Sequence, residues 1–308
     1  MKNKKVGVVI VTFNGMKWIE ACLASLINST IPLSIIVVDN NSTDDTVSFV
    51  KNNFKDIILL EQTQNIGFGK ANNLGIKKAY EEGADYVFLL NQDAWVEPDT
   101  ISNLVKAQKN QPEYGIVSPM HLNGKGDALD YNFSNYINPS KCKNLYSDIF
   151  LNKTLEGIYE TDFVNAAAWL LSRNCIEMVG GFNPSFFHYG EDLNYVERLK
   201  YHGLKTGVLP TSIIYHDREY RKPNKFFSDL NIIYNRSLIL EYSNPFEIKT
   251  FNKEYLKCIK KIFKALFLFN FNQLKQSFFK IKILNNLDKK QIIRNRAESR
   301  RTKNSFIN

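Results

Sequence analysis

Cysteine is scarce and scattered in this sequence. The four cysteines include no CxxC pair and no cluster with histidine; they are Cys22, Cys142, Cys175 and Cys258. A disulfide framework and a zinc knuckle are therefore excluded, and a reducing cytosol is the expected compartment. The first five residues are polar and lead directly into a strand-like stretch, which leaves no room for the apolar segment of a signal peptide. We therefore expect a cytoplasmic protein.

Long hydrophobic runs are also missing from the C-terminal part. Its longest uncharged run, residues 265–274, is far short of the ~20 apolar residues that span a bilayer. Residues 249–308 contain 16 lysines and arginines against three acids, so they carry +13 while the rest of the chain carries −4. Between residues 255 and 269, apolar and lysine side chains occupy opposite helical faces. Such a helix can lie on an anionic membrane, or it can pack its apolar face on the rest of the protein.

Apolar, β-branched runs alternate with segments of helical spacing over the first hundred residues. Strands are predicted at 6–12, 34–38, 57–60, 86–90 and 115–119, and helices at 18–27, 43–53, 65–82 and 99–108. This order is typical of a doubly wound α/β sheet with right-handed crossovers. Residues 123–157 are predicted to be an irregular excursion, and strand or buried-helix character returns at 163–172 and 206–215.

Ligands on such sheets bind beyond the carboxyl ends of the strands. Asp39 ends the second predicted strand, where a carboxylate can accept hydrogen bonds from a nucleotide's base or ribose. The alternative is an Asx turn or an N-cap, for which Ser42 and Asp44 are better placed. We therefore interpret Asp39 as a ligand-binding residue.

The run QNIGFGKANNLG places Gly67 and Gly69 just before a helix whose N-terminus favours phosphate. A dinucleotide fingerprint would instead follow the first strand, and it would need a third glycine where Asn72 stands. An oxidoreductase is therefore the poorer hypothesis.

Asp93 follows the strongly apolar strand 86–90, so it is expected at the carboxyl edge of the sheet. A carboxylate there can hold Mg²⁺ or Mn²⁺, which commonly bridge one or two protein carboxylates to substrate phosphates. The alternative role, capping of the next helix, can be filled by Glu97 and Asp99. Asp93 is therefore the predicted metal ligand.

Glu191 and Asp192 are adjacent acids that follow the aromatic run FFHY. Beside apolar rings, one carboxylate can have its pKa raised toward that of a working base while its neighbour pairs with a donor. The alternative is an acidic first turn that complements a helix dipole. We assign the catalytic role to Asp192 and leave the role of Glu191 open.

His216 follows the strand-like run 208–215, and an isolated histidine is more often structural than a ligand.

Six stretches together resemble the family 2 glycosyltransferases of the GT-A fold, especially the bacterial rhamnosyltransferase-like branch. They are VVIVTFNG, VVDNNSTDDT, QNIGFGKANNLGI, FLLNQDAWVEPDT, FNPSFFHYGEDLNYVERLKYHG and VLPTSIIYH, in the family's order. The resemblance implies a Rossmann-like, mostly parallel central sheet flanked by helices, forming a nucleotide-sugar-binding catalytic domain over residues 1–220. Residues 221–308 are then a basic, helical extension with a disordered end.

The resemblance also implies a set of donor-binding residues. They are Thr12, Asn14, Asp39, Asn65, Gly67, Gly69, Asn73, Asn91 and Gln92. Asp93 resembles the last acid of the family's metal-binding DxD element, Asp192 the general base, and His216 a second metal ligand. Two positions depart from the family pattern. Asn91 replaces the first acid of DxD, so fewer charges hold the metal, and Asn194 stands where relatives often carry aspartate.

These expectations describe an inverting glycosyltransferase that uses Mg²⁺ or Mn²⁺. The expected donor is dTDP-rhamnose or a UDP-sugar, and the acceptor is a hydroxyl of a saccharide, lipid-linked at the inner face of a membrane, in cell-surface polysaccharide synthesis. A sugar nucleotidyltransferase is a rival, but it would place a basic phosphate loop after the first strand, and residues 12–15 contain no basic side chain. A nucleic-acid-binding protein is the second rival. The acidic body argues against nucleic acid as a partner.

Overall fold

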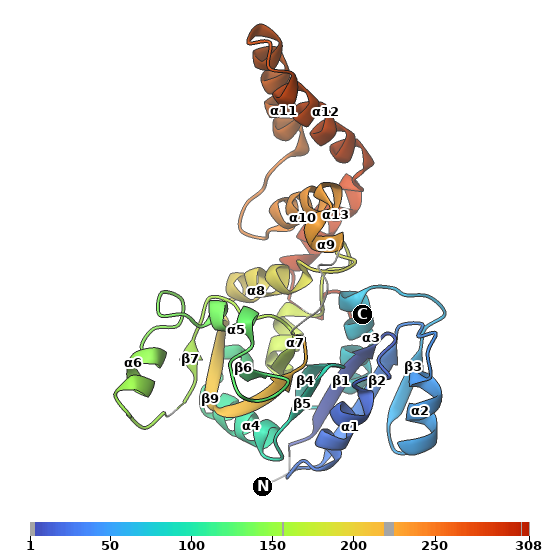
Figure 1. Cartoon of the computed structure of the whole chain (residues 1–308), viewed down its shortest axis with the longest axis vertical. Coiled ribbons are helices and arrows are strands. Elements are labelled where there is room, and N and C mark those ends of the chain that lie inside the picture. The colour runs from blue at the N-terminus through green and yellow to red at the C-terminus, as the bar shows by residue number, and fades with distance from the viewer. Residues whose placement is uncertain (1–3, 156, 219–224, 303, 308) are drawn as a thin grey trace.

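The computed structural model describes residues 4–155, 157–218, 225–302 and 304–307. Its strands are β1 (Val6–Thr12), β2 (Leu33–Asp39), β3 (Ile58–Glu61), β4 (Tyr86–Asn91), β5 (Ala94–Val96), β6 (Tyr114–Asn123), β7 (Tyr159–Glu160), β8 (Ala168–Ser172) and β9 (Lys205–His216). Among the described residues they form one sheet in the order β3-β2-β1-β4-β8-β6-β9-β5, with β7 paired to β9. Helices cover the sheet, and a helical hairpin stands away from it (Figure 1).

The helices fall into a sheet-flanking group and a C-terminal group. The first group is α1 (Ile19–Ile27), α2 (Thr46–Asn53), α3 (Phe68–Glu81), α4 (Thr100–Asn110), α5 (Tyr131–Tyr136), α6 (Leu145–Phe150), α7 (Arg173–Val179) and α8 (Glu191–Tyr201). The second is α9 (Lys225–Ser228), α10 (Leu230–Ser243), α11 (Phe251–Phe267), α12 (Phe271–Asn286) and α13 (Lys289–Ser299).

The first half of the sheet matches the sequence prediction closely. Strands β3, β2, β1 and β4 are parallel neighbours, and α1, α2 and α3 connect them. The second half is mixed, because β8 runs antiparallel to both β4 and β6, whereas β6 and β9 are parallel. The short strand β5 was not predicted from the sequence. It exists through its antiparallel pairing with the end of β9.

The two faces of the sheet bury separate cores, because successive side chains of a strand point to opposite faces. Along β1, Val8 and Ile10 pack in the cluster that includes α1, whereas Val9 packs in the cluster that includes α3. Helix α3 approaches closely because Gly75 faces Val9, and a Cβ at position 75 would lie 2.2 Å from Val9 Cγ1. This packing holds the beginning of α3 at the carboxyl edge of the sheet.

The segment 123–157 was predicted to be irregular, and it contains two short helices, α5 and α6. Asp130 caps α5 by accepting a hydrogen bond from the Phe133 backbone N–H at 2.8 Å. A small core holds the segment against β6 and β9. Its buried members are Met120, Phe133, Ile137, Cys142, Leu145, Val164 and Val208.

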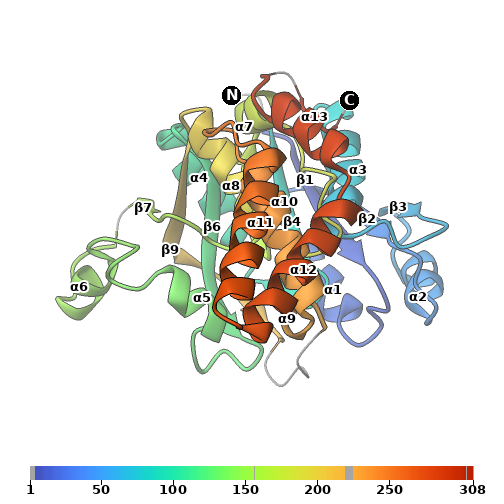
Figure 2. The ribbon, with the colours of Figure 1, turned by 90° about the horizontal axis from the view of Figure 1, so that it is seen from above.

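The C-terminal helices form a structure of their own that stands above the sheet in Figure 1 and lies in front of it when seen from above in Figure 2. Helices α10, α11 and α12 share a buried cluster, in which the Tyr242 and Phe251 rings stack at 4.1 Å. Residues 255–267 of the predicted helix are thus part of α11, which ends at Phe267, and α11 packs on α12 rather than on the sheet. Within the described ranges, no helix combines the length and the apolar content that a membrane span requires.

The end of the chain differs from the disordered end that the sequence suggested. Residues 304–307 return to the sheet domain, where the Ser305 carbonyl accepts a hydrogen bond from the Gly181 N–H at 2.7 Å. Ile307 is buried in the α3-side core, and the guanidinium of Arg198 lies 4.7 Å from the Phe306 ring. These contacts join residues that are distant in sequence, so the local composition of the tail did not predict them.

Replacing Ile307 with alanine is expected to lower the free energy of unfolding by about 2 kcal/mol, because a buried methylene-rich side chain is lost from a packed core. Thermal denaturation of the full chain measures the change. Ile248, which is 68% exposed, is the matched control, and its alanine variant should differ from the parent by less than about 0.5 kcal/mol. Equal melting temperatures for the two variants would show that residues 304–307 do not dock in solution.

Candidate active site

The carboxyl edge of the parallel strands brings three of the predicted donor residues together. In the register of the sheet, Thr12 at the end of β1 lies beside Asp39 at the end of β2, and Val11 lies beside Asn91 at the end of β4. The Thr12 hydroxyl donates to Asp39 Oδ1 at 3.0 Å, and the Ser42 N–H donates to Asp39 Oδ2 at 2.9 Å. The turn that was the alternative role of Asp39 is therefore present. Each carboxylate oxygen still has capacity to accept from a nucleotide.

The turn after β1 is held by two other predicted residues. Asn14, in a left-handed conformation with φ 48°, accepts from the Thr43 N–H at 2.8 Å through its side-chain oxygen. The Gln92 amide pairs with the Phe13 backbone, accepting from its N–H at 2.9 Å and donating to its carbonyl at 3.2 Å. In the structure both side chains shape the loop, and their contact with a donor stays a prediction.

The Asn65 loop is fastened to the end of β2 by a residue that sequence reasoning missed. Asn40 is buried, donates to Asn65 Oδ1 at 3.0 Å and accepts from the Ile66 N–H at 2.9 Å. Asn65 Oδ1 also accepts from the Gly67 N–H at 3.0 Å. The sequence signal that could have found Asn40 is its position directly after Asp39, at the end of a strand.

The beginnings of α3 and α8 lie against each other. Gly67 has φ 87°, and a Cβ there would lie 2.2 Å from the Phe187 carbonyl oxygen. A Cβ at Gly69 would lie 3.5 Å from Glu191 Cβ. Both glycines therefore allow two helix N-termini, which favour anionic groups, to meet at one place.

Asn73 lies further along α3, where its side-chain amide makes hydrogen bonds with the Phe182 and Phe306 backbones. Its predicted donor contact is untested.

Asp93 and His216 are brought together by the pairing of β5 with β9. Ala94 is the register partner of His216, and the Asp217 N–H donates to the Asp93 carbonyl at 2.9 Å. The two side chains are both buried, with His216 Nε2 3.5 Å from Asp93 Oδ2. On the other side of the ring, His216 Nδ1 lies 3.3 Å from Asp130 Oδ2. His216 thus stands between two carboxylates.

This pair fits a divalent cation held in part by the substrate. Among the residues that the structure describes, no group of three or more His, Cys, Asp or Glu side chains could hold a metal alone. Two protein ligands are enough where substrate phosphates complete the shell, as is usual for Mg²⁺. Asp130 would orient the imidazole, as carboxylates commonly do behind a metal-binding histidine. Burial lowers the pKa of His216, but the nearby carboxylates of Asp93 and Asp130 raise it by more. The pKa of His216 is therefore above its ordinary value.

The two acids at the start of α8 have different surroundings. Burial raises the pKa of Glu191 to about 8, the charge of Asp192 adds to the rise, and Arg236 opposes it. The Asp192 side chain is only partly covered, although desolvation raises its pKa as well. A partly exposed side chain can be reached by an acceptor, whereas Glu191 is buried beside Gly69. Asp192 is therefore the better placed of the two as a base.

The pKa of Tyr136 in α5 responds to charges from both parts of the candidate site. Its pKa is raised to about 12, chiefly by burial, and the charges of Asp192 and Asp130 both contribute while Arg218 opposes. Asp192 is one of the two acids at the start of α8, and Asp130 is the carboxylate beside His216 Nδ1. The predicted base and a carboxylate that contacts a predicted metal ligand therefore both act on the same partly buried tyrosine.

Helix α10 of the C-terminal group lies beside the start of α8. The Arg236 guanidinium of α10 lies 6.0 Å from the centre of the Tyr189 ring and 5.6 Å from that of Phe227. A Cβ at Gly190 would lie 3.1 Å from Arg236 Cγ. Neither Arg236 nor Asp130 was singled out from the sequence, because each reaches the site across a long stretch of chain.

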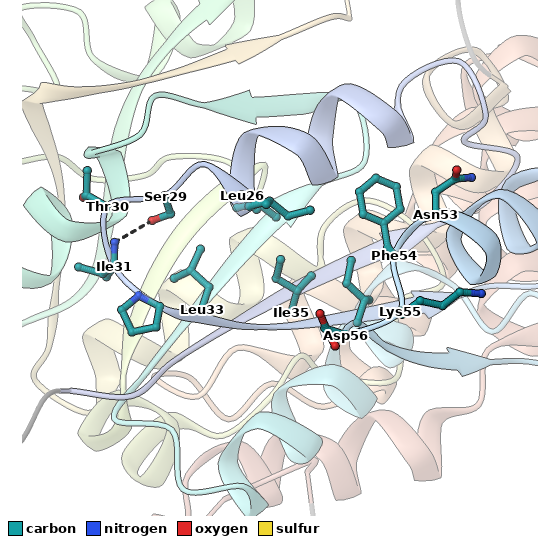
Figure 3. Close-up of a pocket in the computed structure, with 13 residues that line it drawn as sticks. Leu26, Ser29, Thr30, Ile31, Leu33, Ile35, Asn53, Phe54, Lys55 and Asp56 are labelled. Atoms are coloured by element: carbon teal, nitrogen blue, oxygen red, sulfur yellow. Dashed lines mark hydrogen bonds between the residues drawn. The ribbon is translucent and has the colours of Figure 1, made fainter.

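A hollow of about 390 Å³ lies elsewhere, between the end of α1 and the start of β3. Leu33 and Ile35 of β2 and Phe54 are among its lining residues (Figure 3). It is at the amino end of β2, whereas Asp39 is at the carboxyl end, so it takes no part in the candidate site.

Residues 7–174 match the family model described as glycosyl transferase family 2. The N-acetylglucosaminyl-diphospho-decaprenol L-rhamnosyltransferase of Mycobacterium tuberculosis is 25% identical over 69% of this chain and 76% of its own length. The O-antigen chain rhamnosyltransferase RfbN of Salmonella typhimurium is 24% identical over 72% of this chain and 69% of its own.

Solved structures of glycosyltransferases share the fold. TarS residues 1–349 from S. aureus, in complex with UDP, align with a TM-score of 0.51 and 18% identity, covering 76% of this chain and 65% of that one, just under two thirds. The mannosyltransferase PcManGT from Pyrobaculum calidifontis, in complex with GDP-Man and Mn²⁺, aligns with a TM-score of 0.55 and 18% identity over 97% of this chain and 74% of that one. The expected GT-A fold is confirmed.

Proposed function

We propose that this chain, which belongs to glycosyltransferase family 2, moves a sugar from a nucleotide diphosphate to a saccharide hydroxyl with inversion at the anomeric carbon. The observation that carries the proposal is the buried pair of Asp93 and His216, 3.5 Å apart, with Asp130 on the other side of the imidazole. The charges of Asp130 and of Asp192 both act on Tyr136. Asp192 takes the proton from the acceptor hydroxyl, and the oxygen attacks the anomeric carbon opposite the leaving diphosphate. A single displacement of this kind inverts the centre.

Asp93 and His216 would hold Mg²⁺ or Mn²⁺ against the donor diphosphate. The bound ion would neutralise the charge that develops on the leaving group. The beginnings of α3 and α8 add the partial positive charge of two helix N-termini nearby. Thr12, Asn14 and Asp39 would hold the nucleoside, and the Asn65–Gly69 loop would cover the diphosphate.

The acceptor is proposed to be a saccharide linked to a lipid, met at the cytoplasmic face of a membrane. The names of the M. tuberculosis and S. typhimurium relatives support rhamnose as the sugar and a lipid diphosphate as one class of acceptor carrier. The donor is then dTDP-rhamnose, with UDP-sugars as the second candidate. Family membership makes a sugar nucleotidyltransferase the weaker proposal.

A donor panel tests the proposal directly. The chain is incubated with dTDP-rhamnose, UDP-glucose or UDP-N-acetylglucosamine, a short-chain lipid diphosphate saccharide and Mn²⁺, and the product is detected by mass spectrometry. Thermal shifts with each nucleotide diphosphate, with Mn²⁺ and with chelator, report donor binding separately. A donor at 100 times its dissociation constant should stabilise the fold by about 2.7 kcal/mol. Absence of both product and stabilisation across the panel would refute the proposal.

Replacing Asp130 with asparagine is expected to weaken metal affinity by roughly 10–100-fold, because the imidazole of His216 loses the carboxylate that orients it. The midpoint of activation by Mn²⁺ measures the change. Saturating Mn²⁺ should restore most of the turnover, which a collapsed fold would not allow. An unchanged midpoint would separate Asp130 from the metal site.

A further inference from the structure

The α11–α12 hairpin ends in a tight, hydrogen-bonded turn. The Asn270 N–H donates to the Ala265 carbonyl at 2.8 Å, and the Phe269 N–H donates to the Leu266 carbonyl at 3.2 Å. The Asn270 side chain caps α12 by accepting from the Gln273 N–H at 3.0 Å. Phe269 has φ 49°, a left-handed conformation that helix ends usually give to glycine. The backbone of the turn is therefore held by hydrogen bonds from both helix ends.

That turn presents large apolar side chains to the outside. Phe267 is 83% exposed and Phe269 is 81% exposed, and Leu266, Leu268 and Phe271 are exposed as well. We call these five residues the apex. The hairpin helices pack through Cys258, Ala265 and Ser277, which are buried, and this seam leaves the apex uncovered. Figure 1 shows the apex at the end of the molecule farthest from the sheet. Contiguous apolar surface of this kind marks an interaction site.

The charge around the apex selects the partner. Residues 251–286 contain eight lysines and one acid, Glu254. Lys264 and Lys275 flank the apex, and both are exposed. Lysine stems can lie along apolar surface while their ammonium groups reach anionic headgroups. A second copy of the chain would instead bring two strongly cationic hairpins together, which like-charge repulsion opposes.

We propose that the apex inserts into the interfacial region of an anionic lipid bilayer, with the hairpin lysines on the headgroups. Helices α11 and α12 have 17 and 16 residues and are interrupted by lysines, so insertion is shallow, on the order of 5–10 Å. The inference rests on the proposed function in that a lipid-linked acceptor gives membrane binding its purpose. It differs from a helix that lies flat on the membrane, because the contact is the hairpin end.

Vesicle sedimentation of the full chain tests the proposal. The vesicles are phosphatidylcholine alone, or phosphatidylcholine with 30% phosphatidylglycerol. The triple variant Phe267→Ser, Phe269→Ser, Phe271→Ser should bind anionic vesicles at least about tenfold more weakly than the parent. The matched control is Ile149→Ser, Phe150→Ser, Leu151→Ser at the end of α6, another exposed apolar triplet, which should bind like the parent.

A charge variant separates lipid from other partners. Replacing Lys257, Lys261 and Lys264 with glutamine should lower binding to anionic vesicles by roughly tenfold or more and leave binding to neutral vesicles unchanged. Melting temperatures verify folding of all variants. Turnover on a water-soluble acceptor should be equal in the parent and the apex variant, so a failure of the proposed enzyme activity is distinguished from a failure of membrane binding.

Three results would overturn the proposal. The first is that the parent chain does not sediment with anionic vesicles. The second is that the apex variant binds as tightly as the α6 control. In the third, analytical ultracentrifugation finds a parent dimer that the apex variant loses, without vesicle binding, which assigns the apex to self-association instead.

Discussion

Turnover of the Asp192→Asn variant is expected to fall by roughly 10²–10⁴-fold while donor affinity stays the same, because a general base is removed and the donor contacts are kept. Single-turnover rates and donor dissociation constants from thermal shifts measure the two quantities. The asparagine keeps the shape of the side chain and can still accept from the Leu193 N–H, as Asp192 Oδ1 does at 2.8 Å. The start of α8 should therefore persist.

Two companion variants make this result specific. Asp162→Asn changes an exposed acid paired with Lys200 on the surface and should leave turnover unchanged. Glu191→Gln should cost less than Asp192→Asn, because burial raises the pKa of Glu191 to about 8 and an uncharged glutamine resembles the protonated acid. If donor binding collapsed in Asp192→Asn while turnover per bound donor did not, Asp192 would be a donor ligand instead.

The pH profile adds a second readout of the same assignment. A base works only when deprotonated, and the pKa of Asp192 is raised by desolvation, so turnover should fall as the pH drops through that raised pKa. Glu191, Arg236 and Tyr136 face this carboxylate, so the acid limb belongs to the coupled pair of acids. The limb should disappear in Asp192→Asn.

Turnover of the Asp93→Asn variant is expected to fall by roughly 10²–10³-fold, since the diphosphate would leave without a firmly held cation. The stabilisation of the chain by a nucleotide diphosphate should also lose its sensitivity to chelator. Activity measured against Mn²⁺ concentration and thermal shifts with and without chelator are the two measurements. Both effects follow from the loss of the carboxylate that lies 3.5 Å from His216 Nε2.

The control for Asp93 is Asp56→Asn, the same change at the opposite edge of the sheet. Asp56 is exposed and lines the hollow shown in Figure 3, so its variant should keep the activity and metal response of the parent. A parent-like metal response in Asp93→Asn would remove this residue from the metal site, and with it the main support for the proposed chemistry.

The parallel half of the sheet could be predicted because its strands are local signals. The runs at 6–12 and 86–90 are apolar and β-branched or aromatic, and helical spacing lies between them. Strand β5 could not be predicted, since three residues give no periodicity and its partner is the end of β9, more than a hundred residues away. The hairpin was predicted only as one basic helix, because the turn at Asn270 lies in an uncharged run without glycine or proline.

The candidate site divides in the same way. Asp39, Asp93 and Asp192 stand at element ends, where a polar residue after an apolar run is visible in the sequence. Asp130 and Arg236 were missed because their importance comes only from tertiary neighbours, His216 and Tyr189. Gln92 and Asn73 carried the right amide chemistry, but the backbone groups that they bond became visible only in three dimensions.

The return of the chain to Gly181 gives the hairpin two attachments to the catalytic body. One leads through α10, where Asn194 Nδ2 donates to Ser243 Oγ at 3.1 Å, and the other leads through α13 and residues 304–307. An arm fixed at one end can swivel, whereas an arm fixed at two separate points resists rotation. In the proposed mechanism, the surface that binds the far end of this arm therefore also sets the angle at which an acceptor approaches Asp192.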